Sequence, residues 1–214
     1  MNTIIYTDKQ INWSLYGTEN LKFAERRKLL RKLLLITGGL AAGKSTFSNI
    51  LSQRYKVNVF FKDAIKEVLG DTIGFTDRTE NKKLSNASMS LMCFIFSEFA
   101  KLGKDLILES NFHTEELEKL HGIAQDNNYE VLTILLYANV KILHKRYMNR
   151  INNENRHPVH LSTTLDGFED FKRCSDYLVN IKIPGEVLRV NADEFTYQNS
   201  PDLLSKLDCF MKEQ

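Results

Sequence analysis

The apolar positions of this chain gather into short continuous runs that alternate with longer segments of helical periodicity. Apolar runs of about four to eight residues, bounded by turn or polar residues, are typical of buried strands. Five strands are expected on this basis, at residues 33–37, 57–61, 105–109, 130–137 and 185–190. Continuous apolar strands separated by helices predict an α/β fold, in which a parallel sheet carries helices on both faces.

The segments between these strands repeat their apolar residues at intervals of three and four, as amphipathic helices do. The predicted helices cover residues 44–54, 63–69, 81–102, 114–127 and 139–152, and a last helix opens at Ser200 and Pro201. Residues 70–77 are expected to form a turn. A basic amphipathic helix at 21–32 is expected ahead of the sheet, so the chain divides into an N-terminal extension, 1–32, and one domain, 33–214.

Composition and charge narrow the class of protein. With 214 residues the chain can bury a sizeable core, and 29 Lys and Arg against 27 Asp and Glu give a net charge of +2. That balance argues against a nucleic-acid or membrane-surface partner. The three cysteines form no C-x-x-C pair and predict reduced thiols. Neither a secretory leader nor an apolar stretch long enough for a bilayer is apparent, so we expect a cytoplasmic protein.

Candidate chemistry begins directly after the first strand, where residues 38–45 read GGLAAGKS. This is the pattern G-x-x-x-x-G-K-[ST], in which glycines let backbone N–H groups surround phosphate at a helix N-terminus. Lys44 is expected to reach the β- and γ-phosphates, and the Ser45 hydroxyl to coordinate Mg²⁺. The predicted nucleotide-binding residues are Gly38, Gly39, Ala41, Ala42, Gly43, Lys44, Ser45 and Thr46. A glycine-rich turn without a ligand is the alternative, and the strand before and helix after the pattern favour nucleotide binding.

Two acidic residues lie at or just after the carboxyl ends of other predicted strands. Asp63 comes just after the second strand, where its carboxylate could take a proton from a substrate hydroxyl. The alternative is that Asp63 caps the following helix, and both roles can hold together. Glu109 ends the third strand, where an acid that holds Mg²⁺ is expected. A hydrogen bond to substrate is its rival role.

Three arginines lie close together near the end of a predicted helix. Arg146 and Arg150 are four residues apart on one helical face, and Arg156 lies just beyond. This pattern predicts a lid at about 146–163, in which Arg146 and Arg150 act in catalysis and Arg156 binds nucleotide. The alternative is a solvated basic helix end. His157 and His160 have no third ligand near them in the sequence, so we do not expect them to bind metal.

With these motifs in order, the chain resembles the small P-loop kinases of the AAA-type ATP-binding, zeta-toxin and chloramphenicol-phosphotransferase-like group. The resemblance covers about residues 33–193, and GGLAAGKST, FKDAIKEVL, LILESNF and NRHPVH carry it. It implies a three-layer, nucleoside-kinase-like P-loop NTPase fold with a five-stranded parallel sheet in the order 2-3-1-4-5. It also implies ATP and Mg²⁺ as cofactors, Asp63 as the base, lid arginines, and adenine near residues 191–194.

Three functions are consistent with these residues. The first is an ATP-dependent phosphotransferase that acts on a hydroxyl of a small molecule. The second keeps the fold and changes the acceptor to a polynucleotide end or a nucleotide-sugar. The third is a non-catalytic NTP-binding regulator. An acid after the second strand together with lid arginines favours an enzyme, because nucleotide-dependent switching needs neither. The acceptor, the catalytic arginine among the three and the oligomeric state are left open.

Overall fold

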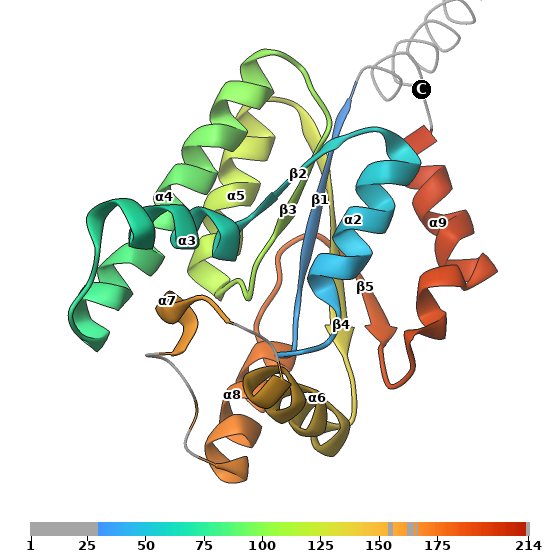
Figure 1. Ribbon diagram of the computed structural model, residues 1–214. Helices are drawn as coiled ribbons and strands as arrows, with labels where there is room; N and C mark the ends of the chain where they lie inside the picture. The colour runs from blue at the N-terminus through green and yellow to red at the C-terminus, as the bar shows by residue number, and fades with distance from the viewer. Residues whose placement is uncertain (1–29, 154–155, 162–164, 166, 213–214) are drawn as a thin grey trace, which may run out of the picture.

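The computed structural model describes residues 30–153, 156–161, 165 and 167–212 (Figure 1). A sheet of five parallel strands forms its centre, in the order β2-β3-β1-β4-β5. The strands are β1 (Arg31–Gly38), β2 (Asn58–Phe61), β3 (Leu106–Glu109), β4 (Tyr129–Tyr137) and β5 (Glu186–Asn191). All four strand pairings are parallel, so the predicted fold class and strand order are confirmed.

Helices cover both faces of the sheet and its carboxyl edge (Figure 1). They are α2 (Lys44–Tyr55), α3 (Lys62–Ile73), α4 (Arg78–Lys101), α5 (Thr114–Asp126), α6 (Val140–Asn153), α7 (Pro158–Leu161), α8 (Phe168–Asn180) and α9 (Pro201–Lys212), with a 3₁₀ turn, η1 (Phe195–Asn199). Helices α2 and α9 lie on one face and α4 and α5 on the other, whereas α6, α7 and α8 lie beyond the ends of the strands.

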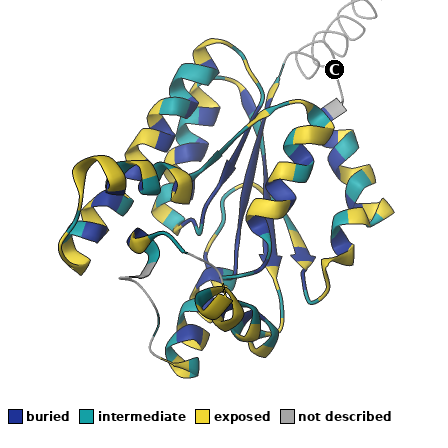
Figure 2. Ribbon diagram, in the orientation of Figure 1, coloured by how far each residue is buried: buried dark blue, intermediate teal, exposed yellow. Residues whose placement is uncertain are grey.

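Strand β1 supplies both layers of the core because successive side chains point to opposite faces. Leu34 and Ile36 pack with α2 and α9, and Leu33 and Leu35 pack with α4 and α5. All four side chains are fully buried, as are most of those along β3 and β4 (Figure 2). Both faces of this central strand are buried, and ligands of parallel α/β sheets bind at the carboxyl ends of the strands. A ligand is therefore expected at the carboxyl end of β1.

Several boundaries differ from those expected. Strand β1 begins at Arg31, and Lys32, which was assigned to the preceding helix, lies in the sheet, where its ammonium pairs with Glu130. The rest of the predicted helix at 21–32 lies outside the described residues, except for residue 30. Helix α3 continues through Gly70 to Ile73, so the turn expected at 70–77 is shorter.

Two helices, α7 and α8, fall in a region where no element was expected. Helix α8 is amphipathic and buries Phe171, Ser175 and Leu178 against the ends of β1 and β4. Its buried residues recur at intervals of four and three, the spacing of an amphipathic helix, so the sequence carried a signal for this helix that was not used. Among the described helices, none has the length and apolar character needed to cross a membrane.

Candidate nucleotide and acceptor site

The P-loop is held tightly between two neighbouring strands. Gly38 has φ +127°, and a Cβ atom on it would lie 2.0 Å from the carbonyl oxygen of Leu136 in β4. The N–H of Gly39 donates to that same oxygen at 3.0 Å. At the other end, Gly43 has φ +88°, and its Cβ would lie 2.8 Å from Cε1 of Phe195. Glycine is therefore required at both ends, and the loop backbone is exposed to a ligand.

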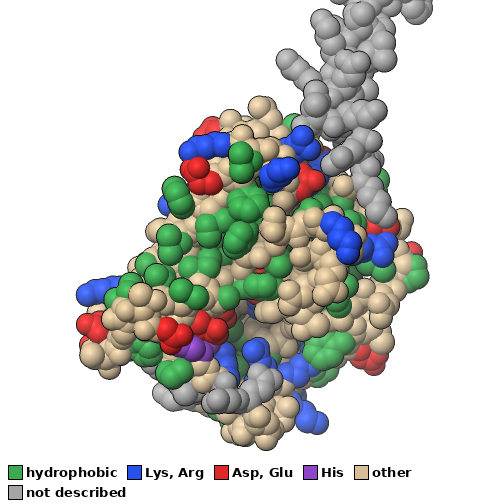
Figure 3. All heavy atoms as spheres, turned by 45° about the horizontal axis from the view of Figure 1, so that its top comes forward, with side chains coloured by type: hydrophobic (Ala, Val, Ile, Leu, Met, Phe, Trp, Pro, Cys, Tyr) green, Lys and Arg blue, Asp and Glu red, His purple; other side chains and the backbone are tan. Residues whose placement is uncertain are grey.

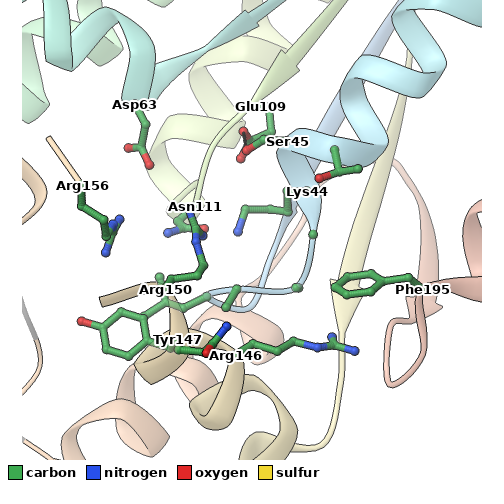
Figure 4. A pocket seen from close by; sticks show the side chains of 16 residues that line it. Lys44, Ser45, Asp63, Glu109, Asn111, Arg146, Tyr147, Arg150, Arg156 and Phe195 are labelled. Atoms are coloured by element: carbon green, nitrogen blue, oxygen red, sulfur yellow. Dashed lines mark hydrogen bonds between the residues drawn. The ribbon is translucent and has the colours of Figure 1, made fainter. Parts of the chain in front are cut away.

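The Lys44 side chain is buried, and its ammonium bonds to the loop itself. Nζ donates to the carbonyl oxygen of Gly39 at 2.9 Å and to that of Gly38 at 3.3 Å. Burial lowers the pKa of Lys44, and the nearby carboxylates of Glu109 and Asp63 oppose this shift. Figure 4 shows the side chain extending from the loop into the cavity, in the position that a phosphate-binding lysine needs.

Ser45 and Glu109 bring two side-chain oxygen atoms together beside the lysine. The Ser45 hydroxyl donates to Oε2 of Glu109 at 2.9 Å, and Glu109 is only 6% exposed. Burial raises the pKa of Glu109, whereas the positive charge of Lys44 and the Ser45 hydrogen bond lower it. Mg²⁺ prefers hard oxygen ligands and is bound by one or two carboxylates together with substrate phosphates. A hydroxyl and a carboxylate in contact fit that requirement.

Two cavities meet beside the P-loop. The first, of about 430 Å³, is lined by residues 40–46 and extends to Asn111, Arg146 and Phe195. The second, of about 660 Å³, lies between the start of α2, helix α3 and helix α7. Five residues line both cavities: Ser45, Asp63, Glu109, Arg150 and Arg156. A group bound in one cavity would therefore meet a molecule bound in the other at these side chains.

Asp63 lies in the first turn of α3, and it is not the N-cap of that helix. The cap position is Phe61, which makes no side-chain cap hydrogen bond, so the capping alternative for Asp63 is wrong. The apolar strand β2 runs into the helix without an intervening polar residue, which shifts the cap two residues earlier. Figure 4 shows the carboxylate of Asp63 directed into the cavity, on the side opposite the P-loop.

The three arginines are divided between the two ends of the site. The guanidinium of Arg146 donates to the carbonyl oxygens of Ala192 and Asp193, both at 2.7 Å, and lies 4.1 Å from the ring centroid of Phe195. Arg150 and Arg156 extend into the space below Asp63 (Figure 4). The fold therefore brings Arg150 and Arg156 to both cavities and places Arg146 with the loop after β5, where adenine was expected.

Phe195 was not among the residues expected at the site, although it lines the first cavity together with Tyr147. Phe195 is 47% exposed and follows β5 by four residues. An aromatic residue so soon after the last strand was the available signal. Asn111, two residues after β3, also lines this cavity, and its Oδ1 atom is buried without a hydrogen-bond partner.

A five-stranded parallel sheet in this order, with a P-loop after its central strand, defines the fold of the P-loop kinases. Comparison with known proteins agrees with this class. The family model described as Zeta toxin matches residues 18–195, and the chain belongs to this family. No curated protein matches the sequence significantly.

Solved structures share the fold at low sequence identity. A candidate kinase from Chloroflexus aurantiacus has a TM-score of 0.71 at 23% identity, covering 86% of this chain and 98% of that one. The APS kinase of Mycobacterium tuberculosis, in complex with AMPPNP and APS, has a TM-score of 0.54 at 12% identity, with coverage of 84% and 98%. The PezAT toxin–antitoxin structure of Streptococcus pneumoniae has a TM-score of 0.50 at 17% identity, with coverage of 90% and 81%.

Proposed function

We propose that this member of the zeta toxin family transfers the γ-phosphoryl group of ATP to a hydroxyl of a small molecule. The observation that carries the proposal is the position of Asp63 on the wall shared by two cavities, one of which contains the P-loop. A kinase needs a nucleotide site, an acceptor site and a proton acceptor where the two meet. A nucleotide-dependent switch needs only the first of these.

In this proposal the first cavity holds the triphosphate. The N–H groups of the P-loop and the start of α2 bind the phosphates, and the Lys44 ammonium exchanges its two carbonyl partners for phosphate oxygens. Ser45 and Glu109 would hold the Mg²⁺ ion, which neutralises charge on the transferring phosphoryl group when bound. Arg146 and Phe195 line the same cavity at the end where the adenine ring of the bound ATP would lie.

The second cavity holds the acceptor. Asp63 accepts the proton of the substrate hydroxyl as that oxygen forms its bond to the γ-phosphorus. The bond between the γ-phosphorus and the bridging oxygen breaks at the same time, and ADP leaves. The guanidinium groups of Arg150 and Arg156 stabilise the negative charge on the transferred group.

The walls of the second cavity favour a polar acceptor. They include the carboxylates of Asp63 and Glu67, the imidazoles of His157 and His160, and the side chain of Asn49. Figure 3 shows acidic and histidine side chains next to a group of Lys and Arg side chains on this part of the surface. The carboxylate oxygens and the Asn49 amide can form several hydrogen bonds to hydroxyl groups, whereas Nε2 of each histidine is already bonded to α3. We therefore expect a polyhydroxylated compound of low molecular weight.

The experiment is a screen of hydroxyl-bearing metabolites with ATP labelled in the γ-phosphate. With the acceptor found, we expect Asp63→Asn to reduce turnover by about 10²- to 10⁴-fold and to leave the ATP dissociation constant nearly unchanged. Lys44→Ala should lose phosphate transfer and bind ATP weakly. Asp126→Asn, at the exposed end of α5, is the matched control and should behave as wild type.

Two outcomes would contradict the proposal. Transfer by Asp63→Asn at the wild-type rate would exclude Asp63 as the base. ATP-dependent capture of a protein partner, without phosphate transfer to any metabolite, would instead favour the regulator. A gel shift with single-stranded nucleic acid at low salt tests the polynucleotide alternative.

A further inference from the structure

The histidines of the HPVH motif fasten helix α7 to helix α3. Nε2 of His157 lies 2.9 Å from Oδ1 of Asp71, and Nε2 of His160 lies 2.7 Å from Oε1 of Glu67. The two carboxylates are four residues apart on α3, so they lie one turn apart on the same side of the helix. Asp63 lies one turn before Glu67 on that side. One helix therefore carries both the candidate base and the two carboxylates that bind the histidines.

One of the two residues between the histidines, Val159, packs against helices α3 and α4. Val159 is fully buried, and its carbonyl oxygen accepts a hydrogen bond from Nδ2 of Asn81 in α4 at 2.7 Å. Nζ of Lys66 lies 3.5 Å from the same oxygen. Gly70 faces this residue, and a Cβ at position 70 would lie 3.3 Å from Cγ2 of Val159. The glycine that was expected to end a helix thus allows α7 to approach α3.

Both ring nitrogens of His157 have a partner. The backbone N–H of Val159 donates to Nδ1 at 3.2 Å, so Nδ1 is an acceptor and carries no hydrogen. Nε2 then carries the hydrogen and donates it to Asp71. Because both nitrogens are bound, the ring cannot rotate without losing a contact. The contacts of α7 with α3 therefore fix the backbone at residue 157, and with it the position from which the Arg156 side chain extends.

We propose that His157 and His160 are positioning residues for Arg156. They hold the backbone next to this arginine on the same rigid helix that carries Asp63, and this fixes the guanidinium relative to the carboxylate across the cavity (Figure 4). The inference rests on the proposed function, because it assigns these histidines a role in phosphate transfer. Displacement of a charge-stabilising group by about 1 Å can cost on the order of 10²-fold in rate.

The kinetic test compares four variants with wild type: the double histidine variant, Arg156→Gln, the combination of the two, and His160→Gln. We expect the double variant His157→Ala/His160→Ala to lower kcat by about ten- to a hundred-fold with little change in the KM for ATP, since the P-loop is untouched. In an Arg156→Gln background the same double change should have no further effect, because the group that the histidines position is gone. His160→Gln, in which His157 is intact, keeps a hydrogen-bond donor for Glu67 and should have most of the wild-type activity.

The matched control is His113→Ala. His113 is exposed, bonds to Tyr177 and lines neither cavity, so this variant should keep wild-type kinetics. Losses that add to those of Arg156→Gln would overturn the proposal, because they would show that the histidines act independently of this arginine. A failure of His160→Gln to retain activity would contradict the role of the Glu67 contact.

A second measurement does not depend on enzyme activity. Amide hydrogen exchange of a peptide covering residues 156–161 should be faster in the His157→Ala/His160→Ala variant and unchanged in Arg156→Gln. Unchanged exchange in the double variant would overturn the docking role. If no acceptor is phosphorylated by wild type, the proposed function fails, whereas the exchange result still reports whether the histidines hold α7.

Discussion

The hydroxyl of Ser45 donates a 2.9 Å hydrogen bond to Oε2 of Glu109, although 64 residues separate them in the sequence. They meet because β1 and β3 are parallel neighbours and Ile36 pairs with Glu109 in register. The P-loop continues from β1, so its hydroxyl lies next to the acid that ends β3. The candidate Mg²⁺ site is thus assembled by the pairing of two strands.

Glu109→Gln should stabilise the protein and abolish Mg²⁺-dependent activity. Burial raises the pKa of Glu109 in the folded chain, so the folded state binds a proton more readily than the unfolded state. This group therefore destabilises the fold as pH rises from the ordinary carboxyl pKa to the raised one. Because glutamine does not ionise, the unfolding temperature of the variant should exceed that of wild type increasingly through this window and by a constant amount above it.

Thermal unfolding at several pH values measures this effect. For a chain of this size each kcal/mol of stabilisation raises the unfolding temperature by about 2–4 °C. Glu118→Gln, at an exposed position in α5, is the control and should show no such trend. A Glu109→Gln variant that is less stable than wild type above the window would contradict the prediction.

Phe195→Ala should weaken the binding of ATP by about tenfold or more. A base stacked on an aromatic side chain gains roughly 1–3 kcal/mol, and Phe195 is an exposed aromatic residue beside the P-loop. Inorganic tripolyphosphate has no base, so its dissociation constant should not change. Equal losses for both ligands would instead indicate damage to the P-loop. Tyr177→Ala, at an exposed aromatic that lines neither cavity, is the control.

Arg146 and Arg150 should differ in which kinetic constant they affect. The guanidinium of Arg146 is bound to the carbonyl oxygens of Ala192 and Asp193, so Arg146→Gln should mainly raise the KM for ATP. Arg150 lines both cavities beside Asp63, and Arg150→Gln should lower kcat by about 10³-fold or more. Steady-state kinetics of the two variants checks this. A large loss of kcat in Arg146→Gln together with a raised KM for ATP in Arg150→Gln would contradict both assignments.

Gly38→Ala should destabilise the fold severely. Its Cβ would lie 2.0 Å from the carbonyl oxygen of Leu136, and φ is +127°. Strand backbone cannot shift cheaply, so we expect a loss of at least about 3 kcal/mol in the free energy of unfolding, measured with urea. Gly122→Ala is the matched control, because nothing lies within 4 Å of its Cβ in helix α5. That change should stabilise the protein by up to about 1 kcal/mol.

Most of the sheet and the P-loop could be predicted because their signals are local. Continuous apolar runs identified all five strands, and the glycines with Lys44 and Ser45 identified the nucleotide loop. Helix α8 was missed although its signal is also local, since Phe171, Ser175 and Leu178 recur at the spacing of an amphipathic helix. Gly70 was interpreted as part of a turn. It lies within α3, and its lack of a side chain makes room for Val159, which is distant in the sequence.

The sequence by itself determined the fold class, the phosphate-binding loop and the set of charged residues at the ends of the strands. These follow from backbone freedom at glycine, from hydrophobic period and from the position of polar residues after apolar strands. Only the tertiary structure decided which charged groups meet: Asp63 with Arg150 and Arg156 at two cavities, Arg146 with Phe195, and His157 and His160 with α3. Such contacts depend on how helices pack beyond the sheet, and that packing joins residues whose separation in the sequence carries no periodic signal.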